Sequence, residues 1–174
     1  KVEIMTQNFA QVRDRYVHSI PVDVVSLAND LGIEVYEKEF ENKSISGYIS
    51  HDNNGYFICV NKKHPATRKQ FTIAHEIGHF VRHRELLDNG SLLPTLYKIG
   101  DGINVCIPRA DFMSPEYRRL ESEANRFAAD LLMPQAEFIQ KANECEDLTE
   151  LAKAFKVSVG AASIRANNLG IEIF

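Results

Sequence analysis

Apolar residues recur at helical spacing along most of the chain, and only one region alternates apolar with polar positions. Residues 6–18 carry apolar side chains on one helical face, and so do residues 21–31. Pro21 is a residue type typical of the first helical turn, and Gly32 is typical of a helix end. The pattern therefore predicts two short helices before the alternating region.

The alternating region predicts a small sheet. Residues 33–40 alternate as expected of a half-buried strand. Residues 44–50 and 56–60 are predicted as two further strands, and residues 52–55 (Asp-Asn-Asn-Gly) as the hairpin turn between them. Three strands placed before a metal-binding helix suit a hydrolase that binds its substrate as an extra strand on a sheet edge. An ordinary structural sheet is the alternative.

The segment FTIAHEIGHFVRH, residues 71–83, holds the motif H-E-x-x-H in His75, Glu76 and His79. A helix turns by about 100° per residue, so two positions four apart lie on nearly the same face. Both imidazoles can therefore bind one metal ion, with Glu76 beside them to take a proton from water at the metal. A surface helix with two incidental histidines is the alternative, but apolar residues flank the motif on both sides.

The next long helix is predicted to begin after Ser114 and to end before Pro134, and it offers two candidates for a third metal ligand. Glu121 shares its helical face with small and apolar residues, whereas the face of Glu123 is charged. We therefore predict that Glu121 points inward and binds the metal. Asn125 follows one turn later and is expected to hydrogen-bond the far nitrogen of a ligand histidine.

Two histidines and one carboxylate leave a fourth coordination position free for water, as in catalytic zinc sites. Other side chains are weaker candidates for the metal. His83 lies about 80° around the helix from His75 and is interpreted as a surface or loop-contacting residue. Cys106 is interpreted as a core or loop cysteine.

Between Glu85 and Arg109 the apolar residues follow neither helical spacing nor strand-like alternation. Glycines, prolines and an Asn-Gly pair interrupt both patterns. This predicts a loop of about 25 residues, longer than most connections. Because it directly follows the metal helix, it is a candidate lid or substrate clamp, and an insertion without a role in the function is the alternative. The apolar residues that would pack over the cleft are Leu92, Leu93, Leu96, Tyr97 and Ile99.

The C-terminal part is predicted to be helical. A helix near residues 135–143 precedes an acidic break, and the spacing over residues 148–168 resembles a helix-turn-helix with its turn at 156–158. Residues 145–174 carry four acids against three bases, a net charge of −1 that is unfavourable for phosphate contacts. We therefore favour a structural helical pair over a DNA reader.

Length, composition and charge limit the number of domains, the partners and the location that the sequence allows. The chain has 174 residues, of which 44% are hydrophobic and 25% charged, which is enough for one domain or one domain with a small appendage. The net charge of −4 gives no reason to expect nucleic acid or an anionic membrane as the main partner. Three distant cysteines, no signal peptide and no membrane-spanning apolar run favour a reducing, cytoplasmic location.

Three segments together resemble the ImmA/IrrE family of metallopeptidases. They are AHEIGH at 74–79, ESEANRFAADLLMP at 121–134, and the closing LAKAFKVS…R…LG. The motif H-E-x-x-H is shared by many zinc peptidases, and the second segment is the more specific one. The resemblance implies an intracellular zinc endopeptidase. Such proteins are often encoded beside a helix-turn-helix repressor, which they cleave or help inactivate to switch on mobile-element or stress genes.

By matching positions, the resemblance places metal ligands at His75, His79 and a glutamate of the E-x-E-A-N segment, and the catalytic base at Glu76. It does not choose between Glu121 and Glu123; only the helical-face argument does. The expected cofactor is one zinc ion or another divalent metal. The donor for the oxyanion stays open, and its candidates are Tyr48, Tyr97, Tyr117 and His83.

The expected fold is α+β and zincin-like, with a small three-stranded sheet packed on the metal helix and a mostly helical C-terminal part ending in a helix-turn-helix-like pair. We expect residues 1–143 to form the zinc metallopeptidase domain and residues 144–174 a subdomain packed on it. The expected partner is a helix-turn-helix repressor as substrate, with no membrane and no direct nucleic acid binding. Two rival functions are a non-catalytic repressor-binding module and a DNA-binding regulator that acts through the C-terminal helices.

Overall fold

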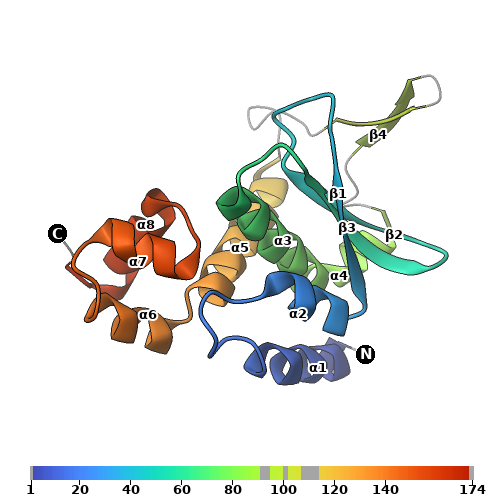
Figure 1. Ribbon diagram of the computed structural model, residues 1–174. Coiled ribbons are helices and arrows are strands. Elements are labelled where there is room, and N and C mark those ends of the chain that lie inside the picture. The colour runs from blue at the N-terminus through green and yellow to red at the C-terminus, as the bar shows by residue number, and fades with distance from the viewer. Residues whose placement is uncertain (1, 91–94, 100–101, 107–113, 173–174) are drawn as a thin grey trace.

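The computed structural model describes residues 2–90, 95–99, 102–106 and 114–172. Figure 1 shows the sheet on one side, α3 and α5 in the middle, and the C-terminal helices on the other side. In chain order the elements are α1 (Val2–Asp14), α2 (Val24–Asp30), β1 (Ile33–Lys38), β2 (Gly47–Asp52), β3 (Gly55–Asn61), α3 (Ala66–Arg82), α4 (Arg84–Asp88), β4 (Thr95–Ile99), β5 (Gly102–Cys106), α5 (Pro115–Leu132), α6 (Gln135–Ala142), α7 (Leu148–Phe155) and α8 (Val159–Leu169). The predicted α+β class is confirmed.

The first three strands form one mixed sheet with the order β1-β3-β2. β1 runs parallel to β3, and β2 runs antiparallel to it with Asp52 opposite Gly55. This is the predicted hairpin, and Gly55 has a φ of +130°, a conformation that other residue types rarely adopt. β2 is an edge strand, and no strand of the described residues pairs with its outer side.

β2 lies directly against α3 because Gly47 has no side chain. A Cβ at Gly47 would lie 2.6 Å from the carbonyl oxygen of Cys59 and 2.7 Å from Cγ2 of Thr72 on α3. Both distances are far shorter than a van der Waals contact, so only glycine permits this packing. The sheet edge is thereby held next to the helix that carries the H-E-x-x-H motif.

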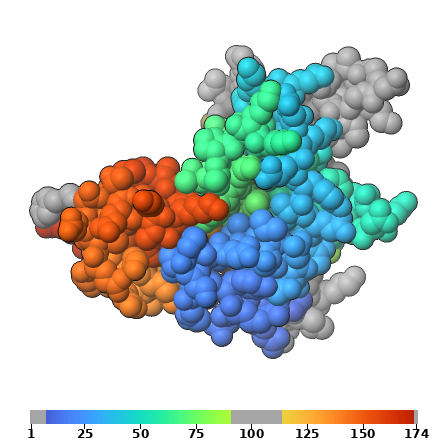
Figure 2. Space-filling model, in the orientation of Figure 1, coloured from blue at the N-terminus to red at the C-terminus, as the bar shows by residue number. Residues whose placement is uncertain are grey.

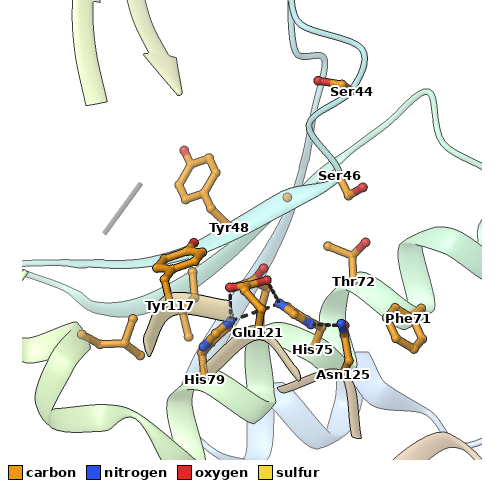
Figure 3. Close-up of a pocket in the computed structure, with 14 residues that line it drawn as sticks. Ser44, Ser46, Tyr48, Phe71, Thr72, His75, His79, Tyr117, Glu121 and Asn125 are labelled. Atoms are coloured by element: carbon orange, nitrogen blue, oxygen red, sulfur yellow. Dashed lines mark hydrogen bonds and ion pairs between the residues drawn. The ribbon is translucent and has the colours of Figure 1, made fainter. Parts of the chain in front are cut away.

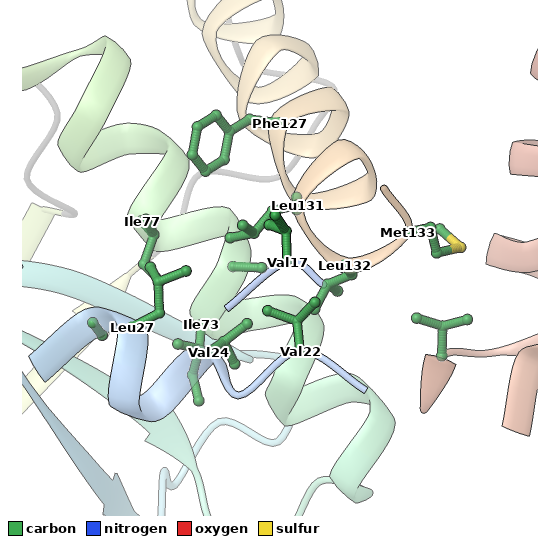
Figure 4. Packing of buried hydrophobic residues seen from close by; sticks show 14 of the residues in the cluster. Val17, Val22, Val24, Leu27, Ile73, Ile77, Phe127, Leu131, Leu132 and Met133 are labelled. Carbon is green, nitrogen blue, oxygen red and sulfur yellow. The ribbon is translucent and has the colours of Figure 1, made fainter. Parts of the chain in front are cut away.

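α3 and α5 cross closely at the centre of the molecule, where they are surrounded by apolar side chains of α2 and the N-terminal segment (Figure 4). At the crossing, a Cβ on Gly78 would lie 3.0 Å from Cδ1 of Phe127 and 3.3 Å from the backbone of Ala124. Leu27, Ile77 and Leu132 are fully buried around this crossing. Small residues at the contact therefore set how near the two helices come.

The N-terminal helices differ in their limits from the prediction. The first helix covers Val2–Asp14 rather than 6–18, and the second begins at Val24 rather than at Pro21. The side chain of Asp23 accepts a hydrogen bond from the backbone N–H of Ser26 at 3.1 Å, so Asp23 is the N-cap. A proline at position 21 therefore lies outside the helix that it was expected to start.

The prediction of an irregular loop over residues 85–109 is wrong for its described part. This part contains the short helix α4 and an antiparallel hairpin of β4 and β5, with Thr95 opposite Cys106. Gly102, a glycine that we interpreted as a loop signal, is the first residue of β5, and the two strands of 5 residues each are too short for periodicity to identify. Leu92 and Leu93 lie outside the described residues, as do the side chains of Leu96, Tyr97 and Ile99.

The C-terminal helices share a core with the rest of the chain. One buried cluster includes Met133 at the end of α5, Phe138 on α6 and Phe155 on α7, and the last two rings lie 5.2 Å apart. α7 ends at Lys156, which adopts the left-handed conformation with a φ of 54°, and Ser158 caps α8. The predicted turn at 156–158 is therefore present. No helix of the described residues is both long and apolar enough to span a membrane.

Replacing Gly78 by valine should separate α3 from α5, because a branched side chain cannot fit against Phe127 and Ala124. We expect the free energy of unfolding to fall by about 1–3 kcal/mol and the affinity for zinc to fall with it. Gly160→Ala is the control, since a Cβ there meets nothing within 4 Å. Denaturant unfolding and zinc titration measure both effects, and equal stability of the two variants would contradict the role given to Gly78.

Candidate metal centre

The helix α3 presents the two histidines of the H-E-x-x-H motif on one face, toward a pocket beside β2 (Figure 3). The Nε2 atoms of His75 and His79 lie 3.0 Å apart. The side chain of His79 is 7% exposed and that of His75 is 15% exposed. One helical turn therefore brings two nearly buried imidazole nitrogens to the same point, as the spacing of four residues predicts.

α5 supplies the carboxylate that completes this group. Ser114 caps the helix by accepting a hydrogen bond from the N–H of Tyr117 at 3.2 Å, with Pro115 in the first turn, as predicted. One oxygen of Glu121 lies 3.3 Å from Nε2 of His75 and the other lies 3.2 Å from Nε2 of His79. The structure thus places Glu121, and not Glu123, against the two imidazoles.

The separations between these three donors suit a small divalent cation. Ligand atoms about 2 Å from a tetrahedral zinc ion lie about 3.3 Å from one another. The contacts among His75, His79 and Glu121 range from 3.0 to 3.3 Å, and one ligand atom from each residue falls within 4.8 Å of the others. Among the residues that the structure describes, no second group of three histidine, cysteine, aspartate or glutamate side chains converges in this way.

A hydrogen bond from α5 orients the first histidine. Nδ1 of His75 lies 2.9 Å from Oδ1 of Asn125, one turn beyond Glu121. Since the amide oxygen can only accept, the proton of this neutral imidazole is assigned to Nδ1. The lone pair of Nε2 then points toward His79 and Glu121. The structure therefore gives Asn125 the contact that the sequence predicted for it.

A longer chain of hydrogen bonds orients the second histidine. Nδ1 of His79 lies 3.0 Å from Nδ1 of His83, whose Nε2 lies 3.1 Å from Glu123, and Arg119 donates to the same carboxylate at 2.9 Å. Glu123 accepts the proton on Nε2 of His83, so Nδ1 of His83 accepts from His79. The Nε2 lone pair of His79 is thus also left free, and two facing lone pairs at this distance favour a cation between them.

The prediction of a surface position for His83 is wrong, since this residue is only 6% exposed. His83 is the residue at which α3 ends, with a φ of −124° and a ψ of 29°, so the angular argument for a continuing helix does not apply to it. The sequence did contain a signal, because His75, His79 and His83 are spaced four apart. On its other side, His83 contacts Glu123, the glutamate that the helical-face argument excluded as a metal ligand.

Charges around the site favour a cation. Burial tends to raise the pKa of Glu121, but hydrogen bonds and charge interactions with His75 and His79 outweigh it and hold that pKa far below its usual value. Burial likewise tends to lower the pKa of His75, yet the carboxylates of Glu121 and Glu76 raise it overall. The carboxylates therefore favour positive charge at the position between these side chains, which suits a metal ion.

The side of the three donors that faces away from the helices opens into a pocket of about 270 Å³. Its walls come from β2, α3 and α5 and include Gly47, Tyr48, Glu76 and Tyr117. Glu76 is 8% exposed. The arrangement leaves room for water and a substrate group next to the three donors, which is the arrangement of a catalytic metal site and not of a closed structural one.

Two histidines and a carboxylate beside an open pocket form a candidate metal site, and the H-E-x-x-H motif is typical of metallopeptidases. A family model described as Peptidase_M78, the IrrE N-terminal-like domain, matches residues 28–167. The chain belongs to this family of metallopeptidases, which confirms the resemblance drawn from the motifs. No curated protein sequence matches the chain.

Among solved structures, the chain is similar to one described as a Mycobacterium tuberculosis transcriptional regulator. The TM-score is 0.57 and the sequence identity is 18%, over 92% of this chain and 51% of that one. The similarity shows a shared fold. The chain spans about half the length of that protein.

Glu121→Gln should lower zinc affinity by more than about 100-fold, because a neutral amide replaces the carboxylate that faces both histidines. Glu123→Gln alters only outer contacts, those of Glu123 with His83 and Arg119, and should cost about tenfold. Competition titration with a zinc chelator measures both affinities. A larger loss in Glu123→Gln than in Glu121→Gln would reverse the assignment of the two glutamates.

Proposed function

We propose that this protein is a zinc-dependent endopeptidase that hydrolyses a peptide bond in a protein substrate, with Glu76 as the general base. The observation that carries the proposal is the convergence of His75, His79 and Glu121 beside an open pocket. Membership of a metallopeptidase family supports the same chemistry.

The edge of β2 offers a place for the substrate backbone. Gly47, Tyr48 and Ile49 of this strand line the pocket above the three metal-binding side chains, and their outer backbone groups face no described strand. An extended peptide can pair with such an edge through main-chain hydrogen bonds, whatever its side chains are. The scissile bond would then lie across the pocket, within reach of Glu76.

Glu76 follows His75 directly in α3 and lines the same pocket. A zinc ion held by His75, His79 and Glu121 would lower the pKa of water and polarise the scissile carbonyl group. Glu76 accepts a proton from the attacking water and then delivers it to the leaving amine, so one carboxylate acts first as base and then as acid. The low exposure of Glu76 limits competing contact with bulk solvent.

Tyr117 is the donor that we propose for the developing oxyanion. Its ring lies over the His79 and Glu121 side of the pocket, whereas the hydroxyl of Tyr48 points away from these side chains (Figure 3). Burial and the carboxylates of Glu121 and Glu76 raise the pKa of Tyr117 well above its usual value, so its hydroxyl keeps its proton. Of the other two candidates, His83 is already engaged by His79 and Glu123, and the side chain of Tyr97 lies outside the described residues.

As substrate we propose a helix-turn-helix transcriptional repressor encoded beside this protein, on the basis of the family resemblance. The rival function as a DNA reader finds little support in α8. Arg165, the only cation of that helix, donates to Asp130 at 2.6 Å and to the carbonyl oxygen of Met133 at 3.0 Å. Its guanidinium group therefore joins α8 to α5 and is occupied. The rival function as a non-catalytic binding module predicts that Glu76 is dispensable.

Glu76→Gln should retain zinc and lose cleavage, because the amide keeps the shape of the side chain but cannot accept the proton. The measurement is intact-mass spectrometry of the purified neighbouring repressor after incubation with the zinc-loaded protein, alongside a chelator titration of zinc. We expect a rate loss of at least about 100-fold. Cleavage at the wild-type rate by this variant would show that Glu76 is not the base.

Tyr117→Phe should lower kcat by about 100- to 1,000-fold, because the variant removes one hydrogen-bond donor to the transition state. Zinc affinity should stay within about tenfold of the wild type, since an outer contact alone changes. Tyr48→Phe is the matched control, because Tyr48 is a half-buried tyrosine of the same pocket whose pKa is raised by burial to about 12. Equal kcat values for the two variants would remove Tyr117 from the mechanism.

A further inference from the structure

A second and larger cavity lies beside the metal pocket. It has a volume of about 770 Å³ and runs between the N-terminal half of α3, the outer face of α5 and one face of α8. Figure 2 shows a notch in the outline of the molecule where the orange C-terminal helices meet the green α3. We call this cavity the α5–α8 groove. It has no part in the proposed hydrolysis.

The α5–α8 groove adjoins the metal pocket. Phe71 and Asn125 line both cavities, and Asn125 also orients His75. At the same end, Arg68 of the groove donates two hydrogen bonds to Ser46, which precedes β2 and lines the metal pocket. A peptide paired with the edge of β2 would therefore pass over Phe71 into the groove on leaving the metal pocket.

The groove combines an apolar floor with an exposed apolar wall. Met133 and Val157 are buried at its base, and Ala129 and Ala161 are small residues that leave it open. Ile164 on α8 lines the groove and is 64% exposed, more than any other large apolar residue of the described part. Exposed apolar surface inside a concave site is typical of surfaces that bind a partner.

The charged residues of the groove have a net positive balance. Its single carboxylate, Asp130, is paired with Arg165 at 2.6 Å. Arg68 and Arg126 also line the groove, and neither forms an ion pair with any residue that the structure describes. Although the chain as a whole is acidic, with a net charge of −4, this surface is therefore suited to carboxylates.

We propose that the α5–α8 groove is a docking site for an apolar and acidic segment of the protein substrate, next to the segment that crosses the metal pocket. This inference rests on the proposed function for the identity of the partner. Ile164 and the floor of the groove bind the apolar side chains of the segment, and Arg68 and Arg126 bind its carboxylates. Substrate choice then depends on a sequence outside the cleaved bond as well as on the bond itself.

The experiment measures binding separately from cleavage. Random peptides on phage are selected on the zinc-loaded Glu76→Gln protein, and synthetic copies of the selected peptides are then titrated by fluorescence anisotropy. We expect selected sequences to combine Leu, Ile or Phe with Asp or Glu. Ile164→Glu and Arg126→Glu, each added to Glu76→Gln, should weaken binding at least about tenfold. Both side chains are exposed, so thermal melting should match the parent protein.

Two substitutions serve as matched controls. Val159→Glu changes an apolar residue of α8 that is 45% exposed and does not line the groove, and Arg118→Glu reverses an exposed charge of α5 outside the groove. Both should leave the peptide affinity unchanged. Equal losses in the controls and the groove variants, selection of basic peptides, or no selected peptide at all would overturn the proposal.

Other outcomes separate this inference from the proposed function. If the groove variants lose binding as expected but the protein with Glu76 intact cuts no bound peptide, the docking site stands and the peptidase proposal fails. A second outcome is that the protein with Glu76 intact cuts the selected peptides and both groove variants bind these peptides with normal affinity. The peptidase proposal then stands and the docking site fails. If Ile164→Glu alone turns a dimer into a monomer and peptide binding is unchanged, the groove is a contact between two copies and the proposal is wrong.

Discussion

The close crossing of α3 and α5 is the contact on which the rest of the site depends. It lets a carboxylate from one helix meet two imidazoles from the other at 3.2 and 3.3 Å in a largely buried place. Gly78 and Ala124 make the approach possible, and the apolar residues around them hold the two helices in register. A separation larger by the size of one side chain would leave Glu121 unable to share a cation with His75 and His79.

Preorganisation of the donors comes from the same two helices. Glu123 and Asn125 follow Glu121 on α5, two and four residues later in the sequence. Through His83 and His75 they set which ring nitrogens carry protons. The segment E-S-E-A-N therefore contains one carboxylate that faces both imidazoles, one in the hydrogen-bond chain and one amide. The two glutamates are therefore not equivalent, although they are only two residues apart. Glu121 faces His75 and His79 within α3, whereas Glu123 faces His83 at the end of α3.

The proposed peptidase uses three neighbouring surfaces of different character. The metal pocket is small and negative, and the edge of β2 offers backbone groups. The α5–α8 groove is apolar and carries Arg68 and Arg126, which form no ion pair with the described residues. Gly47 joins the first two surfaces by bringing β2 against α3, and Phe71 lies between the metal pocket and the groove. The ion pair of Arg165 with Asp130 fixes α8 against α5, so the C-terminal helices form one wall of the groove.

The sequence by itself determined the local features of this protein: the H-E-x-x-H helix, the hairpin turn before Gly55, the cap at Ser114 and the inward face of Glu121. Each of these follows from residue types within a few positions, where helical angle and turn preference act. Tertiary structure alone decided the parallel pairing of β1 with β3, the burial of His83 against Glu123 and the hairpin of β4 and β5. These depend on contacts between residues far apart in the chain, or on strands too short for periodicity, so no local pattern predicts them.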